Sequence, residues 1–255
     1  MMMKSISAEW KKIWFPKSSR LYLILATISS ILMGLIFALT TQVTQDRSLF
    51  ELDPMSIIGA NMLGVDVVTI LLLLFVAIQI GREFQGKTIQ SYLAATPARS
   101  RYFIAKALML CLVSLVIGII VALVAFFDGQ LLVSAVHKQM PALSEVWQLA
   151  AGSIVMPPFY VLLTVCATFS ARNTAAGIIM PLIVLFLPAI AKLFPKMLQN
   201  MVIPTLPASA IHTLSGMAQK GSIEYTGILA AFVVLGFWVL LSAALAIWKF
   251  RKKDI

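Results

Sequence analysis

PMSIIGANMLGVDVVTILLLLFVAIQI, residues 54–80, is an apolar run of 27 residues whose one charged side chain is Asp66. A membrane-spanning helix needs about 20 predominantly apolar residues, whereas a buried strand usually has roughly 4–8. The run therefore predicts a helix that crosses a bilayer. Five further runs meet the same criterion, at residues 21–41, 103–127, 149–169, 173–191 and 225–248.

The composition agrees with six crossings. Of the 255 residues, 60% are hydrophobic and 12% are charged, whereas a soluble domain is about 45–50% apolar and about 25% charged. This excludes a soluble globular protein, a disordered chain and a secreted disulfide-rich mini-protein. We expect an all-α, polytopic membrane protein with six transmembrane helices, folded as a single transmembrane domain over residues 1–255.

The distribution of basic residues predicts the orientation in the membrane. The formal net charge is +10. With the N-terminus inside, the predicted cytoplasmic segments hold 15 Lys and Arg residues and the outer segments hold 5. Because Lys and Arg collect in cytoplasmic loops, this ratio predicts that both termini are inside. Topology thus accounts for the basic charge, and we expect no nucleic-acid partner.

Two segments outside the spans are also partly apolar. Residues 5–16 carry apolar side chains at helical spacing, namely Ile6, Trp10, Ile13 and Trp14. This pattern predicts an amphipathic helix in the plane of the cytoplasmic interface, ended by Pro16, with an extension of the first span as the alternative. Residues 194–224 contain three prolines. They are too broken to span the bilayer, so we expect short helices that re-enter the outer leaflet.

Residues 81–88, GREFQGKT, match the pattern G-x-x-x-x-G-K-[ST] of phosphate-binding loops. That function requires a strand before the loop and an α/β domain around it. Here a run long enough to cross a bilayer precedes the loop. A nucleotide site would also need an apolar strand that ends in Asp, and residues 122–128 superficially match that pattern. Asp128, however, falls on the opposite side of the predicted membrane from Lys87. We therefore interpret the match as coincidental and expect this chain not to be an enzyme.

Other chemically versatile side chains are isolated. His137 and His212 have no neighbouring ligands in the sequence. Cys111 and Cys166 lie inside apolar runs at a spacing that matches no zinc or haem motif, and we expect them to pack as buried thiols. The sequence offers no nucleophile with a matching base and orienting acid. We predict no catalytic residue, no metal site and no cofactor in this chain.

The loop at residues 81–102 has a second organisation, which resembles the first cytoplasmic loop of permease subunits of ABC-2 type transporters. Such loops carry a Glu at the end of the second span, then Gly-Thr, leucines, a Pro, Ser or Arg, and a Lys. The matching residues here are Glu83, Gly86, Thr88, Leu93, Pro97, Arg99, Ser100, Arg101 and Lys106. In this chain Lys87 separates the Gly from the Thr, which are usually adjacent. The length, the six spans, the N-terminal helix and the proline-broken segment resemble the bacitracin-resistance and lantibiotic-immunity branch.

The resemblance implies a function. The chain would be the membrane subunit of an ATP-driven exporter in a bacterial plasma membrane, moving an amphipathic or hydrophobic substrate such as an antimicrobial peptide. Two copies of a separate ATPase subunit would bind ATP and Mg²⁺ and dock on the loop. A second permease, identical or paralogous, would complete the complex. Glu83 would transmit the movement of the ATPase, directly or through Arg82 and Arg101, unless it is an ordinary solvated charge.

Asp66 is the acid placed deepest in a span, 12 residues into the run at 54–80. Charged side chains at such depth are costly and usually face a cavity or a partner. One interpretation is a contact on the substrate path or a proton site. The other is a hydrogen bond between or within helices, for example to Asn61 or Thr69. A stand-alone carrier or channel with Asp66 as its ion site is the alternative function.

Overall fold

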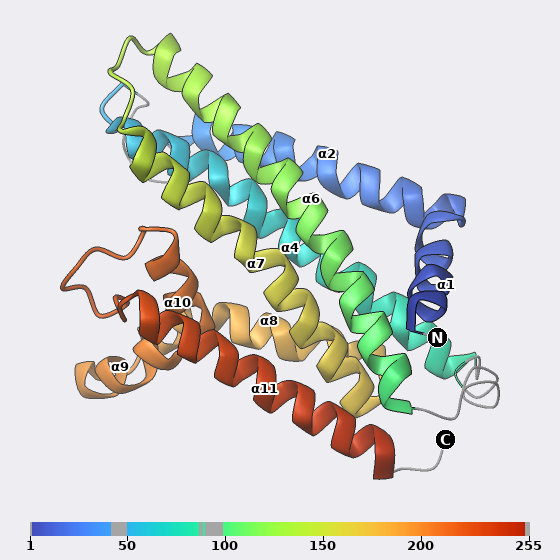
Figure 1. Ribbon diagram of the computed structural model, residues 1–255. Coiled ribbons are helices and arrows are strands. Elements are labelled where there is room, and N and C mark those ends of the chain that lie inside the picture. The colour runs from blue at the N-terminus through green and yellow to red at the C-terminus, as the bar shows by residue number, and fades with distance from the viewer. Residues whose placement is uncertain (1, 42–49, 87–88, 90–98, 253–255) are drawn as a thin grey trace.

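The computed structural model describes residues 2–41, 50–86, 89 and 99–252. Within these residues every regular element is a helix, and six helices are long and apolar enough to cross a membrane. They are α2 (Lys17–Leu39), α4 (Pro54–Gln85), α6 (Arg99–Ala135), α7 (Leu143–Ala171), α8 (Thr174–Ala191) and α11 (Ile228–Lys252) (Figure 1). The predictions of an all-α fold and of six spanning helices are thereby confirmed.

Several helices extend beyond the predicted spans. Helix α6 continues past both ends of residues 103–127. Helix α4 continues past residue 80 to Gln85, so the first residues of the predicted loop at 81–102 are helical. Apolar composition marks only the part of a helix that suits hydrocarbon, whereas backbone hydrogen bonding continues until a cap. In α4 this cap is Gly86, whose N–H still donates to the Arg82 carbonyl.

Local sequence explains where several helices begin and end. Asp53 accepts a hydrogen bond from the backbone N–H of Ser56, and Pro54 occupies the first turn, a favoured start for a helix. Arg172 ends α7 in the left-handed conformation, with φ 55°. The Asn173 side chain then accepts from the Ala175 N–H and starts α8. The connection between α7 and α8 is therefore only two residues long.

Helices α4, α6 and α7 form the centre of the bundle (Figure 1). Helix α2 packs against one side of this centre, and α8 and α11 lie on the other side. Small residues permit the closest approach of α2 to α4. A Cβ atom added to Gly64 would lie 2.6 Å from the Ser30 carbonyl oxygen. Close backbone packing of this kind is typical of helices in membranes.

The N-terminal helix α1 (Met2–Trp14) is separate from α2 and lies at a steep angle to it (Figure 1). The break falls at Phe15 and Pro16, as Pro16 predicts. Helix α1 packs against α6, and Ile13 is buried there. The start of α1 and the end of α11 lie at the same end of the bundle, as an even number of crossings requires.

Short helices fill the segment between α8 and α11. They are α9 (Lys196–Val202), η1 (Ile203–Thr205) and α10 (Pro207–Leu214). Helix α10 is mostly buried and packs against α7 and α11, whereas α9 has no buried residue. The indole N–H of Trp238 donates to the Thr205 carbonyl at 3.0 Å, which fixes η1 to α11.

Candidate functional site

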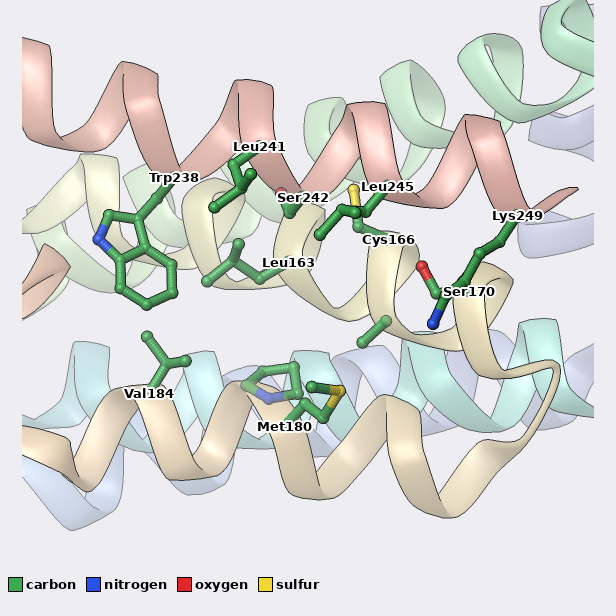
Figure 2. A pocket seen from close by; sticks show the side chains of 12 residues that line it. Leu163, Cys166, Ser170, Met180, Val184, Trp238, Leu241, Ser242, Leu245 and Lys249 are labelled. Carbon is green, nitrogen blue, oxygen red and sulfur yellow. The ribbon is translucent and has the colours of Figure 1, made fainter.

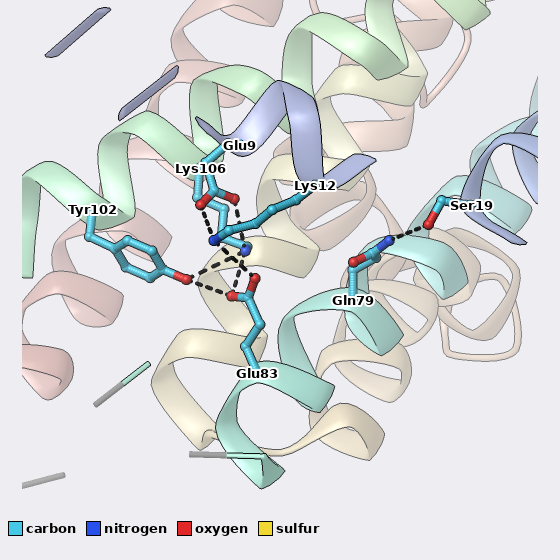
Figure 3. Close-up of polar contacts among 7 residues, drawn as sticks. All are labelled: Glu9, Lys12, Ser19, Gln79, Glu83, Tyr102 and Lys106. Carbon is cyan, nitrogen blue, oxygen red and sulfur yellow. Dashed lines mark hydrogen bonds and ion pairs between the residues drawn. The ribbon is translucent and has the colours of Figure 1, made fainter. Parts of the chain in front are cut away.

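Two acids and two bases from three helices meet at one end of the bundle (Figure 3). The ammonium of Lys106 on α6 lies 2.5 Å from Oε2 of Glu83 on α4 and 3.0 Å from Oε2 of Glu9 on α1. Lys12 pairs with Glu9 on its own helix, and its Nζ lies 3.5 Å from Oε1 of Glu83. The Tyr102 hydroxyl donates to Oε2 of Glu83 at 2.5 Å. We call these five residues the ion cluster.

The centre of the ion cluster is buried, whereas Glu83 and Lys12 at its edge are partly exposed. Lys106 is 3% exposed and Glu9 is 5% exposed. Removing a charge from water costs several kcal/mol unless a well-placed partner compensates it. Two carboxylates and two ammonium groups sum to zero formal charge, and the phenol of Tyr102 adds a donor. The cluster therefore compensates its own charges, and each member depends on the others.

Helical spacing places some members of the ion cluster side by side. Tyr102 and Lys106 are four residues apart on α6, and Glu9 and Lys12 are three apart on α1, so each pair shares a helix face. Glu83 lies in the last turn of α4. The packing of α6 against both α1 and α4 brings these two pairs and Glu83 together. The cluster thus ties the N-terminal helix to both helices that flank the loop after α4.

An aromatic group adjoins the ion cluster at the same end of the bundle. Phe169 of α7 is fully buried. Its ring makes edge-to-face contacts with Phe103 of α6, Phe250 of α11 and Phe84 of α4, at centroid distances of 5.1, 5.1 and 5.5 Å. Such contacts add roughly 0.5–1.5 kcal/mol each beyond area burial. The ends of α4, α6, α7 and α11 are therefore joined through one packed group.

The structure describes only part of the predicted loop motif. Glu83 lies in the ion cluster, Gly86 caps α4, and Arg99 is the first residue of α6. Arg82 and Arg101 are exposed, and the described cations that contact Glu83 are Lys106 and Lys12 instead. The remaining predicted positions, Thr88, Leu93 and Pro97, lie outside the described residues.

The phosphate-loop pattern has a helical setting. Residues 81–85 belong to α4, and the residues before them are helix rather than strand. A Cβ atom added to Gly81 would lie 1.8 Å from Oγ1 of Thr174, so this Gly lets α4 touch the start of α8. Lys87 and Thr88 lie outside the described residues. Packing thus explains the first Gly of the pattern.

Asp66 lies in the middle of α4, where it interacts electrostatically with Tyr160 of α7 and His212 of α10. The two suggested partners on its own helix bond elsewhere. Asn61 donates to the Ala125 carbonyl at 2.7 Å, and Thr69 donates to the Val65 carbonyl at 2.8 Å. The Tyr160 hydroxyl is buried and has no hydrogen-bond partner among the described residues. Polar groups on α7 and α10 are therefore within electrostatic range of Asp66 on α4.

His212 connects this interior region to the end of the bundle opposite the ion cluster. Its Nδ1 lies 3.0 Å from Oε2 of Glu224, and the Lys192 ammonium lies 2.8 Å from Oε1 of the same carboxylate. Burial raises the pKa of Glu224, but hydrogen bonds with Lys192 and His212 outweigh it and hold the pKa below its ordinary value. Glu224 is thus kept ionised between two basic groups.

Sequence reasoning missed Glu9, Lys12 and Tyr102 as site residues. One signal was present. Lys106 lies near the start of an apolar run, and an ionisable group there requires a partner. Glu83 at the end of the preceding span was one candidate for that partner. No local pattern linked either residue to Glu9, which is 97 positions from Lys106.

Six apolar helices with a compensated ion cluster at one end define a multi-pass membrane protein. Comparison with known protein families matches residues 5–188 to the family described as ABC-2 family transporter protein. The match covers most of the chain, and the chain belongs to this family. Membership implies a membrane component of an ABC transporter system that works with an ATPase partner. No curated protein matches the chain.

Proposed function

We propose that the chain is the permease subunit of an ATP-driven ABC exporter, that it has no catalytic site, and that ATP and Mg²⁺ bind to a separate ATPase subunit. The observation that carries this proposal is the ion cluster. It joins α1, α4 and α6 near the residues where α4 ends and α6 begins. A subunit docked on that connection would push on the ion cluster first.

The end of the bundle with the ion cluster faces the cytoplasm in this proposal. Its support is the concentration of basic residues there, at the start of α2, the end of α4, the start of α6 and the end of α11, namely Lys17, Arg20, Arg82, Arg101 and Lys249. We call it the basic end. Cytoplasmic segments favour such charges. Both termini are then inside, and α9 and α10 re-enter the outer leaflet.

Helix α1 lies along the cytoplasmic interface in this arrangement. Trp10 and Trp14 stack at a centroid distance of 5.5 Å and are 41% and 46% exposed. Tryptophan favours the headgroup region of a membrane. Glu9 and Ile13 face the protein, where they are buried. Helix α1 would therefore slide along the surface only if the ion cluster moved with it.

The ion pairs of the ion cluster would transmit a movement of α4 to the neighbouring helices. Lys106 holds Glu83 and Glu9 with the same ammonium, so a displacement of α4 pulls on both α6 and α1. The aromatic group around Phe169 extends the path to α7 and α11. Two ATPases and a second permease, identical or paralogous, would complete the exporter in a bacterial plasma membrane. The substrate is an amphipathic or hydrophobic molecule, with antimicrobial peptides as the first class to test.

The variant Glu83→Gln tests the coupling role. The amide keeps the size of the side chain but removes the charge that balances Lys106, so we expect the complex to assemble and ATP hydrolysis to fall roughly tenfold, equivalent to about 1.4 kcal/mol. The measurement is ATP hydrolysis by the complex in lipid nanodiscs, with survival on bacitracin as the cellular readout. Arg82→Gln is the matched control, because it removes an exposed charge from the adjacent position. Equal rates for Glu83→Gln and the control would remove Glu83 from the mechanism.

Purification of the tagged chain from its native membrane tests the assembly. We expect an ATPase subunit to accompany the chain in fixed proportion, and a second permease sequence to appear if the pair is paralogous. A chain that purified alone and supported flux without ATP would overturn the exporter proposal. It would favour the alternative of a carrier or channel with Asp66 as the ion site.

A further inference from the structure

A groove of about 220 Å³ lies between α7, α8 and α11 (Figure 2). Its walls are almost entirely apolar and include Leu163 of α7, Pro181 of α8 and Leu241 of α11. Two groups mark its ends. Trp238 lies at one end and Lys249 at the other, both on α11. We call this feature the α8–α11 groove.

The end of the groove at Lys249 is polar and lies at the basic end of the bundle. Lys249 is exposed and forms no ion pair with any described residue. Figure 2 shows its side chain reaching from α11 toward the end of the groove where Ser170 of α7 lies. The next residue, Phe250, packs against Phe169, which places this end of the groove level with the aromatic group. One cation and one hydroxyl therefore lie beside the opening.

The end of the groove at Trp238 is held by a hydrogen bond. The Trp238 indole N–H donates to the Thr205 carbonyl at 3.0 Å, which holds the ring in place at this end of the groove. Trp238 and Lys249 are 11 residues apart, so they are separated by about 16 Å along a helix that rises about 1.5 Å per residue. The hydrocarbon core of a bilayer is about 30 Å thick. The groove therefore has about the length of one leaflet.

We propose that the α8–α11 groove binds an anionic phospholipid, with the phosphate against Lys249 and Ser170 and one acyl chain along the apolar walls as far as Trp238. The length of the groove matches one leaflet, and its single charge lies where a headgroup would be. Basic pockets between transmembrane helices on the cytoplasmic side bind anionic headgroups by the same chemistry. The assignment of this lipid to the cytoplasmic leaflet rests on the orientation proposed above, but binding of the lipid does not depend on transport.

Native mass spectrometry of the purified full chain tests this site, with phosphatidylglycerol and phosphatidylcholine of the same acyl composition as probes. We expect phosphatidylglycerol to bind at least tenfold more tightly than phosphatidylcholine. Lys249→Gln should remove that preference, whereas Arg82→Gln, which removes another exposed cation from the basic end, should retain it. Equal binding of the two lipids, or a preference that survives Lys249→Gln, overturns the proposal.

A photo-reactive benzoylphenylalanine at Leu241 tests what occupies the groove in native membranes. Leu241 is exposed and lines the groove, so the larger side chain has room at its rim. We expect an adduct with the mass of a phospholipid. An adduct with a second copy of the chain would identify the groove as a subunit interface and overturn the proposal. Because neither test measures transport or ATP hydrolysis, both can fail while the exporter proposal stands, and the reverse also holds.

Discussion

Lys106 is the residue on which the ion cluster depends most. Its ammonium contacts both carboxylates, Glu9 and Glu83, and its side chain is 4% exposed. Breaking a buried ion pair by removing one partner costs about 3–5 kcal/mol, because the remaining charge is left uncompensated. Removing both partners is much less costly. The consequence of a substitution therefore depends on the charge that it leaves behind.

We expect Lys106→Met to destabilise the protein by about 3–5 kcal/mol. The double variant Lys106→Met with Glu83→Gln restores charge balance, since Lys12 then faces Glu9 alone, and it should recover at least half of this loss. The measurement is thermal unfolding of the purified chain in detergent. A double variant no more stable than Lys106→Met would show that charge balance does not govern the cluster.

Asp66 presents the opposite case, a carboxyl group in mid-span with no ammonium or guanidinium partner among the described residues. Burial of such a group is unfavourable, and a neutral amide of similar shape reduces the cost. We expect Asp66→Asn to leave thermal stability equal or higher while it lowers ATP-driven transport. Unfolding and export by the same preparation supply the measurement.

Asp53→Asn is the matched control for Asp66→Asn, because it makes the same change at the N-cap of the same helix. Asn and Asp are about equally good N-cap residues, so we expect neither stability nor transport to change. If Asp66→Asn exported like the wild type, Asp66 would be assigned to helix packing rather than to the substrate path.

At the scale of helices, the crossing of α2 and α4 depends on two glycines. A Cβ atom on Gly34 would lie 2.5 Å from the Asn61 carbonyl oxygen, and one on Gly64 would lie 2.6 Å from the Ser30 carbonyl oxygen. Neither backbone can yield without separating the helices. This contact holds α2 against α4 at the centre of the bundle.

We expect Gly64→Leu to destabilise the fold by about 1–3 kcal/mol or more, the usual cost of overpacking. Gly59→Leu is the control on the same helix, because a Cβ there meets no atom within 4 Å. Thermal unfolding in detergent measures both variants. Equal midpoints for the two would contradict a close approach of α2 and α4 at Gly64.

At the scale of the whole molecule, the proposed orientation fixes which residues an impermeant thiol reagent can reach. The native cysteines, Cys111 and Cys166, are part-buried and buried, and can be replaced by Ala. In that background we expect Lys220→Cys to be labelled in intact cells, whereas Ser18→Cys, also exposed, should be labelled only after permeabilisation. The measurement is gel-shift labelling with a maleimide. The reverse pattern would place the basic end outside.

The sequence predicted much of the architecture but less of the candidate site. Apolar runs identified the six spanning helices that the described residues contain, and Pro16 located the break between α1 and α2. The predicted spans at 54–80 and 103–127 are shorter than α4 and α6, because hydropathy does not report the backbone hydrogen bonds that continue a helix beyond the apolar run. Glu83 was predicted as a site residue that acts on the ATPase directly or through Arg82 and Arg101. The described cations that it contacts are Lys106 and Lys12.

Properties that depend on composition and spacing were determined by the sequence alone. The free energy of burying apolar side chains in lipid is a sum over neighbouring residues, so a run such as 54–80 specifies a membrane helix without knowledge of the fold. The partners of a buried charge are different. Glu9 meets Lys106 only after α1 packs against α6, and Asp66 comes within electrostatic range of Tyr160 and His212 only after α4, α7 and α10 assemble. Tertiary structure decided these pairings, because electrostatic contacts depend on distance in space rather than separation along the chain.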